Sequence, residues 1–290
     1  MLADDAFLRQ LPTGIAPEQA VLIETLVYCA DAVETSYDAI RLTALTHADQ
    51  AARSMNRSAR VRMFTDAWTI VDCIHVARQV LQALAYPTAA ATQFQTKYEI
   101  ASQLRNKMDH VVGQARNHSN REDQPPLLGM ISYCYDGLQQ TGAGYTLGDT
   151  CTIFAISHGH IRSRATMDAI QPTDLPTPLV YQEQFEQFGH IAHGFHLSAF
   201  KAGLLFPLEA AAHDMAALIE EVNQQASQLV PGQLQKHAET EGVDVRQLMR
   251  PAGSDLVVWF KLKRTAEPTE LRSNQSGSGA TGSGSADAAV

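Results

Sequence analysis

The sequence predicts an α+β fold that is mainly α, in which an antiparallel helical bundle carries a small inserted antiparallel β-meander. Three observations predict it. Apolar residues recur every three or four positions over three long segments between residues 17 and 117. Between residues 128 and 170 this pattern gives way to β-branched and aromatic residues separated by clustered glycines. Hydrophobic residues make up 45% of the 290 residues, which is enough for one sizeable core.

Each of the three helices is predicted from one apolar face. The first starts at Pro17, a residue suited to a first helical turn, and its apolar face comprises Leu22, Leu26, Cys29, Val33, Tyr37, Ile40 and Ala44. The second follows an expected N-cap at Ser58, ends before Pro87, and its face comprises Phe64, Ala67, Val71, Ile74, Ala77, Leu81 and Leu84. The third runs from about Thr92 to Ala115 and its face comprises Phe94, Tyr98, Ala101, Leu104, Met108 and Val111.

Five segments are expected along the chain. An irregular lead-in at 1–16 precedes the helical bundle at 17–127, and the β-meander with a proline-rich loop occupies 128–182. Helices at 183–265 complete the bundle and end in a strand near 254–263. Residues 266–290 are rich in Ser, Gly and Ala, and we predict that they are disordered. Such a composition buries too little apolar surface to offset the entropy of the chain.

Charge and cysteine content limit the binding partners and the compartment that we expect for this protein. The formal net charge of −9 gives no global attraction to nucleic acid or to anionic membranes, so nucleic-acid binding requires a local basic patch. The four cysteines contain no C-x-x-C pair and are expected to be thiols in a reducing compartment. We find neither a signal peptide nor an apolar run long enough to cross a membrane. We therefore predict a cytoplasmic protein without a membrane partner.

One short motif carries chemistry, the run Leu104-Arg105-Asn106-Lys107-Met108-Asp109-His110 in the third predicted helix. It resembles the R-x4–6-H motif of the HEPN superfamily, in which a polar residue usually follows the arginine, and here that residue is Asn106. The upstream segment 64–81 and the helical setting fit the same resemblance, which covers about residues 17–117. The inserted β region is the main departure, because a minimal HEPN domain has no counterpart to it.

The resemblance implies a metal-independent endoribonuclease, or an RNA-binding relative, that uses no cofactor. Arg105, Asn106 and His110 would be its catalytic residues, and a homodimer would bring two motifs together in one groove. The chemistry is reasonable, because histidine transfers protons near neutral pH and arginine presents a fixed fork of donors to a charged phosphorane. Since Arg105 lies about 100° round the helix from Asn106, a single helix does not easily close the site.

Basic residues supply candidate RNA contacts, namely Arg53, Arg57, Arg60, Arg62 and Lys107. The four arginines would follow a phosphate backbone, although a charged loop between helices is the commoner explanation for such a cluster. The chain has no P-loop, no G-x-G-x-x-G after a strand and no G-x-S-x-G. Readings as an NTPase, a dinucleotide enzyme or a serine hydrolase therefore lack support.

Two further patterns near the motif remain open to a plainer interpretation. Arg105 and Asp109 are four residues apart, so they also suit an ordinary surface ion pair. Asp72, His75 and Arg78 lie on successive turns of the second helix, where they would either support the motif histidine or form a solvated edge. The rival function is a non-catalytic module that binds an unidentified protein.

A histidine-rich run favours no metal site. His190, His193 and His196 form H-x-x-H-x-x-H, whereas metal sites on helices prefer a spacing of four. The run contains no acidic or cysteine residue, and its glycines weaken a helix. We interpret it as scattered polar residues near a turn, and we expect no bound metal.

Overall fold

A computed structural model describes residues 2–47, 55–118, 125–136, 138–141, 144–147, 152–159, 187–201 and 204–251. The chain divides into two units, 1–254 and 255–290, and all the described residues belong to the first unit. The proline-rich loop expected at 171–182, the strand expected near 254–263 and the disordered tail expected at 266–290 lie outside the described residues.

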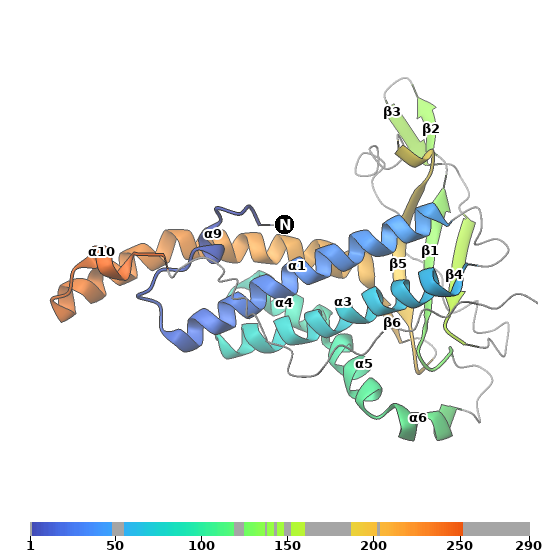
Figure 1. Cartoon of the computed structure of the whole chain (residues 1–290), viewed down its shortest axis with the longest axis horizontal. Coiled ribbons are helices and arrows are strands. Elements are labelled where there is room, and N and C mark those ends of the chain that lie inside the picture. The colour runs from blue at the N-terminus through green and yellow to red at the C-terminus, as the bar shows by residue number, and fades with distance from the viewer. Residues whose placement is uncertain are drawn as a thin grey trace, which may run out of the picture. The chain divides into compact units, whose positions relative to one another are not determined.

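Helices make up most of the described structure, which confirms the prediction of a mainly α protein. The long helix α1 (Pro17–Thr46) runs antiparallel to both α3 (Arg57–Ala83) and α9 (Leu208–Glu241) (Figure 1). The shorter helical elements are η1 (Phe7–Arg9), α4 (Ala89–Lys97), α5 (Glu99–Asp109), α6 (Val111–His118) and α10 (Val245–Leu248). No helix among the described residues has both the length and the apolar character to cross a membrane.

The start of α3 differs slightly from the prediction. The side chain of Asn56 accepts a hydrogen bond from the Ala59 N–H at 2.8 Å, so Asn56 is the N-cap and the expected cap Ser58 lies inside the helix. Arg57, Arg60 and Arg62 therefore lie on the first two turns of α3 and not in a loop. The fourth member of the expected basic cluster, Arg53, lies outside the described residues.

The prediction of a single helix from Thr92 to Ala115 is wrong, because the helix is interrupted at two residues. Tyr98 has φ −104° and ψ 23° between α4 and α5, and His110 has φ −110° and ψ 27° between α5 and α6. The first break accompanies a long-range contact, in which the buried Tyr98 donates its hydroxyl proton to the Asp214 carboxylate of α9 at 2.8 Å. Local apolar periodicity does not report such a contact, and it continues across the break.

The strands are β1 (Met130–Asp136), β2 (Leu138–Thr141), β3 (Gly144–Leu147), β4 (Thr152–Ser157), β5 (Ile191–Ser198) and β6 (Leu205–Pro207). One antiparallel sheet has the strand order β4-β1-β5-β6, and β2 pairs with β3 in a separate two-stranded sheet. Antiparallel strands between residues 128 and 170 are thus confirmed. Their connectivity is not a simple meander, because β1 pairs directly with β4.

Strand β5 overturns part of the prediction that residues 183–265 contain helices completing the bundle. Residues 191–198 and 205–207 are strands, whereas α9 and α10 fit that prediction. Every residue of β5 is buried, and the strand pairs with β1 and β6 along its edges while α1 and α9 pack against it. A strand buried on both faces lacks the alternation of polar and apolar residues that marks a strand in sequence.

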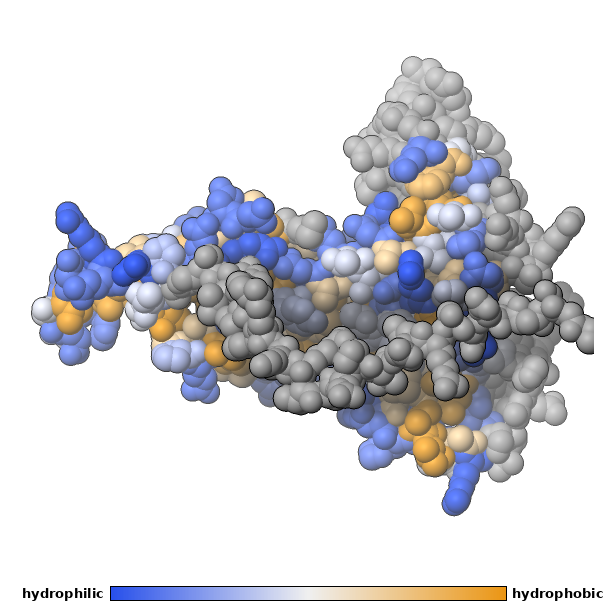
Figure 2. All heavy atoms as spheres, viewed as in Figure 1, coloured by the Kyte–Doolittle hydropathy of each residue, from blue (hydrophilic) through white to orange (hydrophobic). Residues whose placement is uncertain are grey.

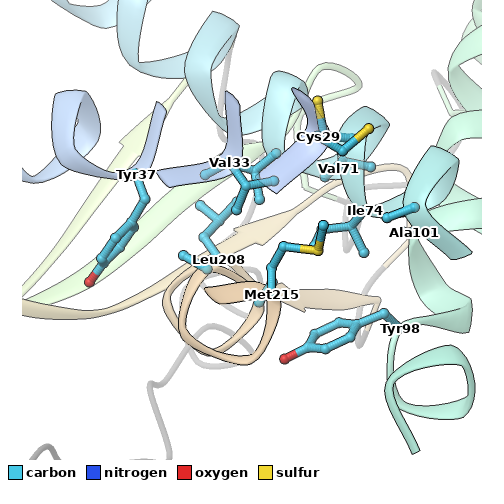
Figure 3. Packing of buried hydrophobic residues seen from close by; sticks show 14 of the residues in the cluster. Cys29, Val33, Tyr37, Val71, Ile74, Tyr98, Ala101, Leu208 and Met215 are labelled. Atoms are coloured by element: carbon cyan, nitrogen blue, oxygen red, sulfur yellow. The ribbon is translucent and has the colours of Figure 1, made fainter. Parts of the chain in front are cut away.

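The hydrophobic core is continuous from the helices to the sheet. Figure 3 shows Val33 of α1, Val71 of α3 and Met215 of α9 meeting in one cluster. Phe195 of β5 meets the ring of Tyr37 from α1 edge-on at 5.9 Å, which joins the sheet to the bundle. The apolar faces predicted for the first two helices are largely buried, which confirms the sequence periodicity. Figure 2 shows hydrophilic residues over much of the visible helical surface, with smaller hydrophobic groups between them.

Candidate functional site

The HEPN-like motif lies at the carboxyl end of α5, on the side of the helix that faces solvent. Ala101 and Leu104 are fully buried and fasten α5 to the core. Asn106 and His110 are exposed, and Arg105 is half-buried. His110 is the residue that follows the last helical residue Asp109, so it belongs to the helix end and not to the helix. The motif side chains are therefore open to a ligand, and the apolar face of α5 is separate from them.

Arg105 forms two ion pairs. Its Nε lies 3.0 Å from Oδ1 of Asp72 on α3, and its Nη1 pairs with Oδ1 of Asp109 one turn along α5. The ion pair between Arg105 and Asp109 that the spacing allows is thus present in the structure. Half of the Asp72 side chain is exposed, and ion pairs as accessible as these typically contribute under about 1 kcal/mol.

A second set of polar contacts lies next to Arg105, where α5 packs on α3 (Figure 1). The Oγ of Ser102 lies 2.9 Å from Nδ1 of His75, and it also accepts a hydrogen bond from Nη1 of Arg78. Nε of Arg78 donates to the carbonyl oxygen of Gln95 at 2.8 Å. We call Asp72, His75, Arg78, Ser102 and Arg105 the α3–α5 seam. All five of its residues are half-buried.

The sequence indicated part of this seam. Asp72, His75 and Arg78 were expected either to support the motif histidine or to form a solvated edge. In the structure, Asp72 instead pairs with Arg105, and both His75 and Arg78 form hydrogen bonds with Ser102. Ser102 escaped sequence reasoning, because it lies 27 residues from His75 and belongs to no motif. Ser102 lies two residues before Leu104, where the motif run begins, and nothing in the local sequence distinguishes it.

The charges of the seam change the proton affinities of its members. Burial lowers the pKa of His75, Arg78 and Arg105 lower it further, and Asp72 and Asp109 oppose them. Burial raises the pKa of Asp72, while Arg105 and His75 lower it. Burial also lowers the pKa of the Arg78 guanidinium. These shifts favour the neutral form of His75, in a seam that also holds two arginines.

The expected RNA-binding residues do not form one group with the motif. Arg62 lies ten residues before Asp72 on α3, which corresponds to about 15 Å along the helix. Arg57 and Arg62 line a shallow hollow with Val61 and Thr65 near the start of α3. Lys107 lies on α5 beside the motif. Of the basic residues singled out as RNA contacts, only Lys107 is close to Arg105 in the chain.

The histidine-rich run lies in the sheet. His193 is fully buried, and its Nε2 lies 3.1 Å from the buried Oδ2 of Asp136 on β1. His196 is buried as well, with Nδ1 2.8 Å from the carbonyl oxygen of Gly194. The expectation of polar residues near a turn is therefore wrong for these two histidines. Sequence reasoning missed the Asp136–His193 pair because it joins strands 57 residues apart.

No group of three or more His, Cys, Asp or Glu side chains is placed to hold a metal ion within the described part of the chain. Comparison of the chain with protein-family models, with curated proteins and with solved structures gives no significant match.

Proposed function

We propose that this chain is a HEPN-like protein that cleaves RNA without a metal ion, using Arg105, Asn106 and His110. The observation that carries the proposal is the accessibility of the motif. Asn106 and His110 are exposed and Arg105 is half-buried, while the fully buried residues of α5 are Ala101 and Leu104. The side chains of Asn106 and His110 are therefore accessible to an RNA phosphate without any change in the packing of α5.

The proposed reaction uses the 2′-hydroxyl of the RNA as its nucleophile. The O2′–P bond forms as the P–O5′ bond breaks, a base removes the 2′ proton, and an acid protonates the departing O5′ atom. His110 is the proposed proton-transfer group. Arg105 stabilises the extra negative charge of the phosphorane, and Asn106 orients the phosphate by hydrogen bonding. The products carry a 2′,3′-cyclic phosphate and a 5′-hydroxyl.

One motif supplies one histidine, whereas the reaction uses both an acid and a base. We therefore propose that two copies of the chain form a homodimer in which two motifs face one groove. The proposal places the protein in the cytoplasm together with RNA. Cys29 and Cys73 are in keeping with a reducing compartment, because they are thiols in hydrogen-bond contact and not a disulfide.

The carboxylates around Arg105 do not rule out a phosphate ligand. Both ion pairs of Arg105 are solvent-accessible and weak. A phosphate can receive two parallel charge-assisted hydrogen bonds from one guanidinium, whereas each of these carboxylates pairs with a single nitrogen of Arg105. RNA binding would thus replace Asp72 and Asp109 as partners of Arg105.

The test is cleavage of single-stranded RNA in EDTA by the wild type, by His110→Ala and by Arg105→Ala. His110→Ala should lose about 10²–10⁴-fold in rate, the usual contribution of one acid–base group, and Arg105→Ala about 10²–10³-fold, as for the loss of one group that stabilises transition-state charge. Gln103→Ala is the matched control, because Gln103 is an exposed residue of the same helix outside the motif. Activity of His110→Ala within about tenfold of wild type, or loss of wild-type activity in EDTA, would refute the mechanism.

One observation favours the rival function, a non-catalytic protein–protein interaction module. Arg105 is already engaged by Asp72 and Asp109, as expected of a residue that ties α5 to α3. This alternative predicts a folded protein that cleaves no RNA. It also predicts that the only effect of Arg105→Ala is a change in the stability of the protein.

A further inference from the structure

The α3–α5 seam contains more hydrogen-bond donors than its own acceptors use. An arginine has five N–H groups, and the hydrogen bonds of Arg78 to Gln95 and Ser102 use Nε–H and one Nη1 proton. We propose that Arg78, His75, Ser102 and Arg105 form a phosphate-binding site that takes a phosphodiester of a polynucleotide backbone. The proposal rests on the proposed function only for the polynucleotide, because the donors would bind any accessible phosphate.

The geometry of the donors supports this site. The carbonyl of Gln95 holds the Arg78 guanidinium through Nε, so its remaining N–H groups are fixed in direction. Ser102 Oγ accepts from Arg78, so its own proton is available to Nδ1 of His75. With Ser102 as the donor to Nδ1, the neutral imidazole carries its proton on Nε2, where it is a donor. The seam thus presents an imidazole N–H beside two guanidinium groups.

The backbone behind these donors is rigid. Ile74 and Ala77 on α3 and Ala101 and Leu104 on α5 have no exposed surface, so both helices are packed into the core around the seam. A site on packed helices loses little freedom when a ligand binds. Partial exposure of all five seam residues leaves the donors within reach of an anion.

The electrostatics point to an anion. Among the described residues, no carboxylate lies within ion-pair distance of Arg78, although the more distant Glu99 carboxylate raises its pKa. After burial, Arg78 and Arg105 are the next largest causes of the lowered pKa of His75, and they outweigh the opposing effects of Asp72 and Asp109. Asp72 and Asp109 hold Arg105 in the absence of a ligand, and an incoming phosphate would compete with them for it.

The experiment measures binding by the full-length chain of two probes, inorganic pyrophosphate and a 2′-O-methyl RNA oligonucleotide. The 2′-O-methyl group blocks the nucleophile, so binding is read without cleavage. Arg78→Ala should weaken binding of the oligonucleotide by about 10- to 100-fold, the usual effect of losing hydrogen bonds to a charged group. The control Arg246→Ala removes an equal charge from the exposed surface of α10 and should leave affinity within about twofold.

A second readout does not depend on whether the variants fold. The imidazole resonances of His75 should shift on titration of wild type with either probe, and the pKa of His75 should rise because a bound phosphate favours the imidazolium. The exposed His237 of α9 is the internal control and should not change. Arg78→Lys, which keeps the charge without the fork, should bind more weakly than wild type.

Each outcome decides the proposal. Saturable oligonucleotide binding that pyrophosphate displaces and Arg78→Ala weakens supports a backbone-phosphate site. Binding of pyrophosphate alone supports the phosphate site and contradicts its link to RNA. An unmoved His75, or equal losses in Arg78→Ala and Arg246→Ala, overturns the site. Failure of the proposed nuclease is separate, because it appears as absent cleavage while the non-cleavable probes still bind.

Discussion

His75 in the α3–α5 seam and His193 in the sheet both have lowered pKa values, but their surroundings contrast. Burial is the largest cause of the lowered pKa in both. His193 has no exposed surface and bonds to the Asp136 carboxylate, which opposes the effect of burial. His75 is half-buried, bonds to a serine, and lies near two arginines that lower its pKa further.

The difference shows how the same side chain serves structure in one place and is available to a ligand in the other. A ligand cannot reach His193 unless the sheet opens, so its imidazole satisfies a buried carboxylate. His75 is accessible, and its nearest charges attract an anion. Burial alone therefore does not identify a functional histidine, whereas partial exposure beside positive charge does. Four substitutions test this contrast.

The largest effect is expected for His193→Ala. The variant leaves the Asp136 carboxylate buried without its hydrogen-bond donor and also opens a cavity. Removing one member of a buried pair typically lowers the free energy of unfolding by about 3–5 kcal/mol. Urea unfolding followed by circular dichroism measures this value. His75→Ala is the comparison, and an equal loss of stability in that variant would remove the distinction between the two regions.

The second-largest effect is expected in the pH dependence of the unfolding free energy, to which His193 contributes. The pKa of His193 is lower in the folded protein than its unfolded value of about 6.5. Its contribution to stability is therefore complete above about pH 6.5 and is lost as the pH falls from there through the folded pKa, because the unfolded chain then binds the proton more tightly. The slope for one such group reaches about 1.4 kcal/mol per pH unit.

His193→Gln should flatten this slope below about pH 6.5. Unfolding free energies of the variant and of wild type are measured at each pH, so carboxylates common to both proteins cancel in the difference. His237→Gln replaces an exposed histidine and should retain the wild-type slope. An unchanged slope in His193→Gln would mean that His193 is not the group that titrates.

A smaller effect is expected at Gly194, which sets the geometry of β5 beside His193. Gly194 has φ 64°, and Ser132–Cys134 of β1 faces His193–His196 of β5 at a register shift. Its N–H donates to the carboxylate of Glu209. Gly194→Ala should lower the unfolding free energy by about 1–2 kcal/mol, because a side chain strains the left-handed conformation.

The matched control for Gly194 is Gly113→Ala in α6. A Cβ atom at Gly113 meets nothing within 4 Å, and alanine favours helix over glycine. This substitution should be neutral or stabilising by up to about 1 kcal/mol. A similar loss in both variants would show that the left-handed backbone at Gly194 is not what limits substitution there.

The smallest effect is expected at the rim of the seam. Asp109→Ala removes one exposed partner of Arg105 and leaves Asp72 in place, so the unfolding free energy should change by less than about 1 kcal/mol. Phosphate binding should be retained or become tighter, because one competing carboxylate is gone. Calorimetric titration with pyrophosphate measures the second effect. A loss of several kcal/mol in the unfolding free energy would instead show that the Arg105–Asp109 ion pair stabilises the fold as strongly as the buried Asp136–His193 pair is expected to.

Apolar periodicity and residue composition predicted the helices and strands whose structure depends on residues close together in the sequence. The apolar faces of α1 and α3 follow the helical period, and Val33, Val71 and Ile74 are buried as that period requires. The antiparallel strands near residues 130–157 follow from β-branched and aromatic composition. Arg105, Asn106 and His110 were selected from the resemblance of their run to the HEPN motif, and in the structure Asn106 and His110 are exposed while Arg105 is half-buried.

The sequence by itself determined the mainly α class, the faces of the long helices and the position of the motif, because each depends on residues within a few turns of one another. Only the tertiary structure decided that β5 is a strand, because a strand whose residues are all buried lacks the alternation of polar and apolar residues that marks a strand in the sequence. The same holds for the contacts of His75 with Ser102 and of His193 with Asp136. Their partners are 27 and 57 residues away, and chain folding alone brings such residues into hydrogen-bond distance.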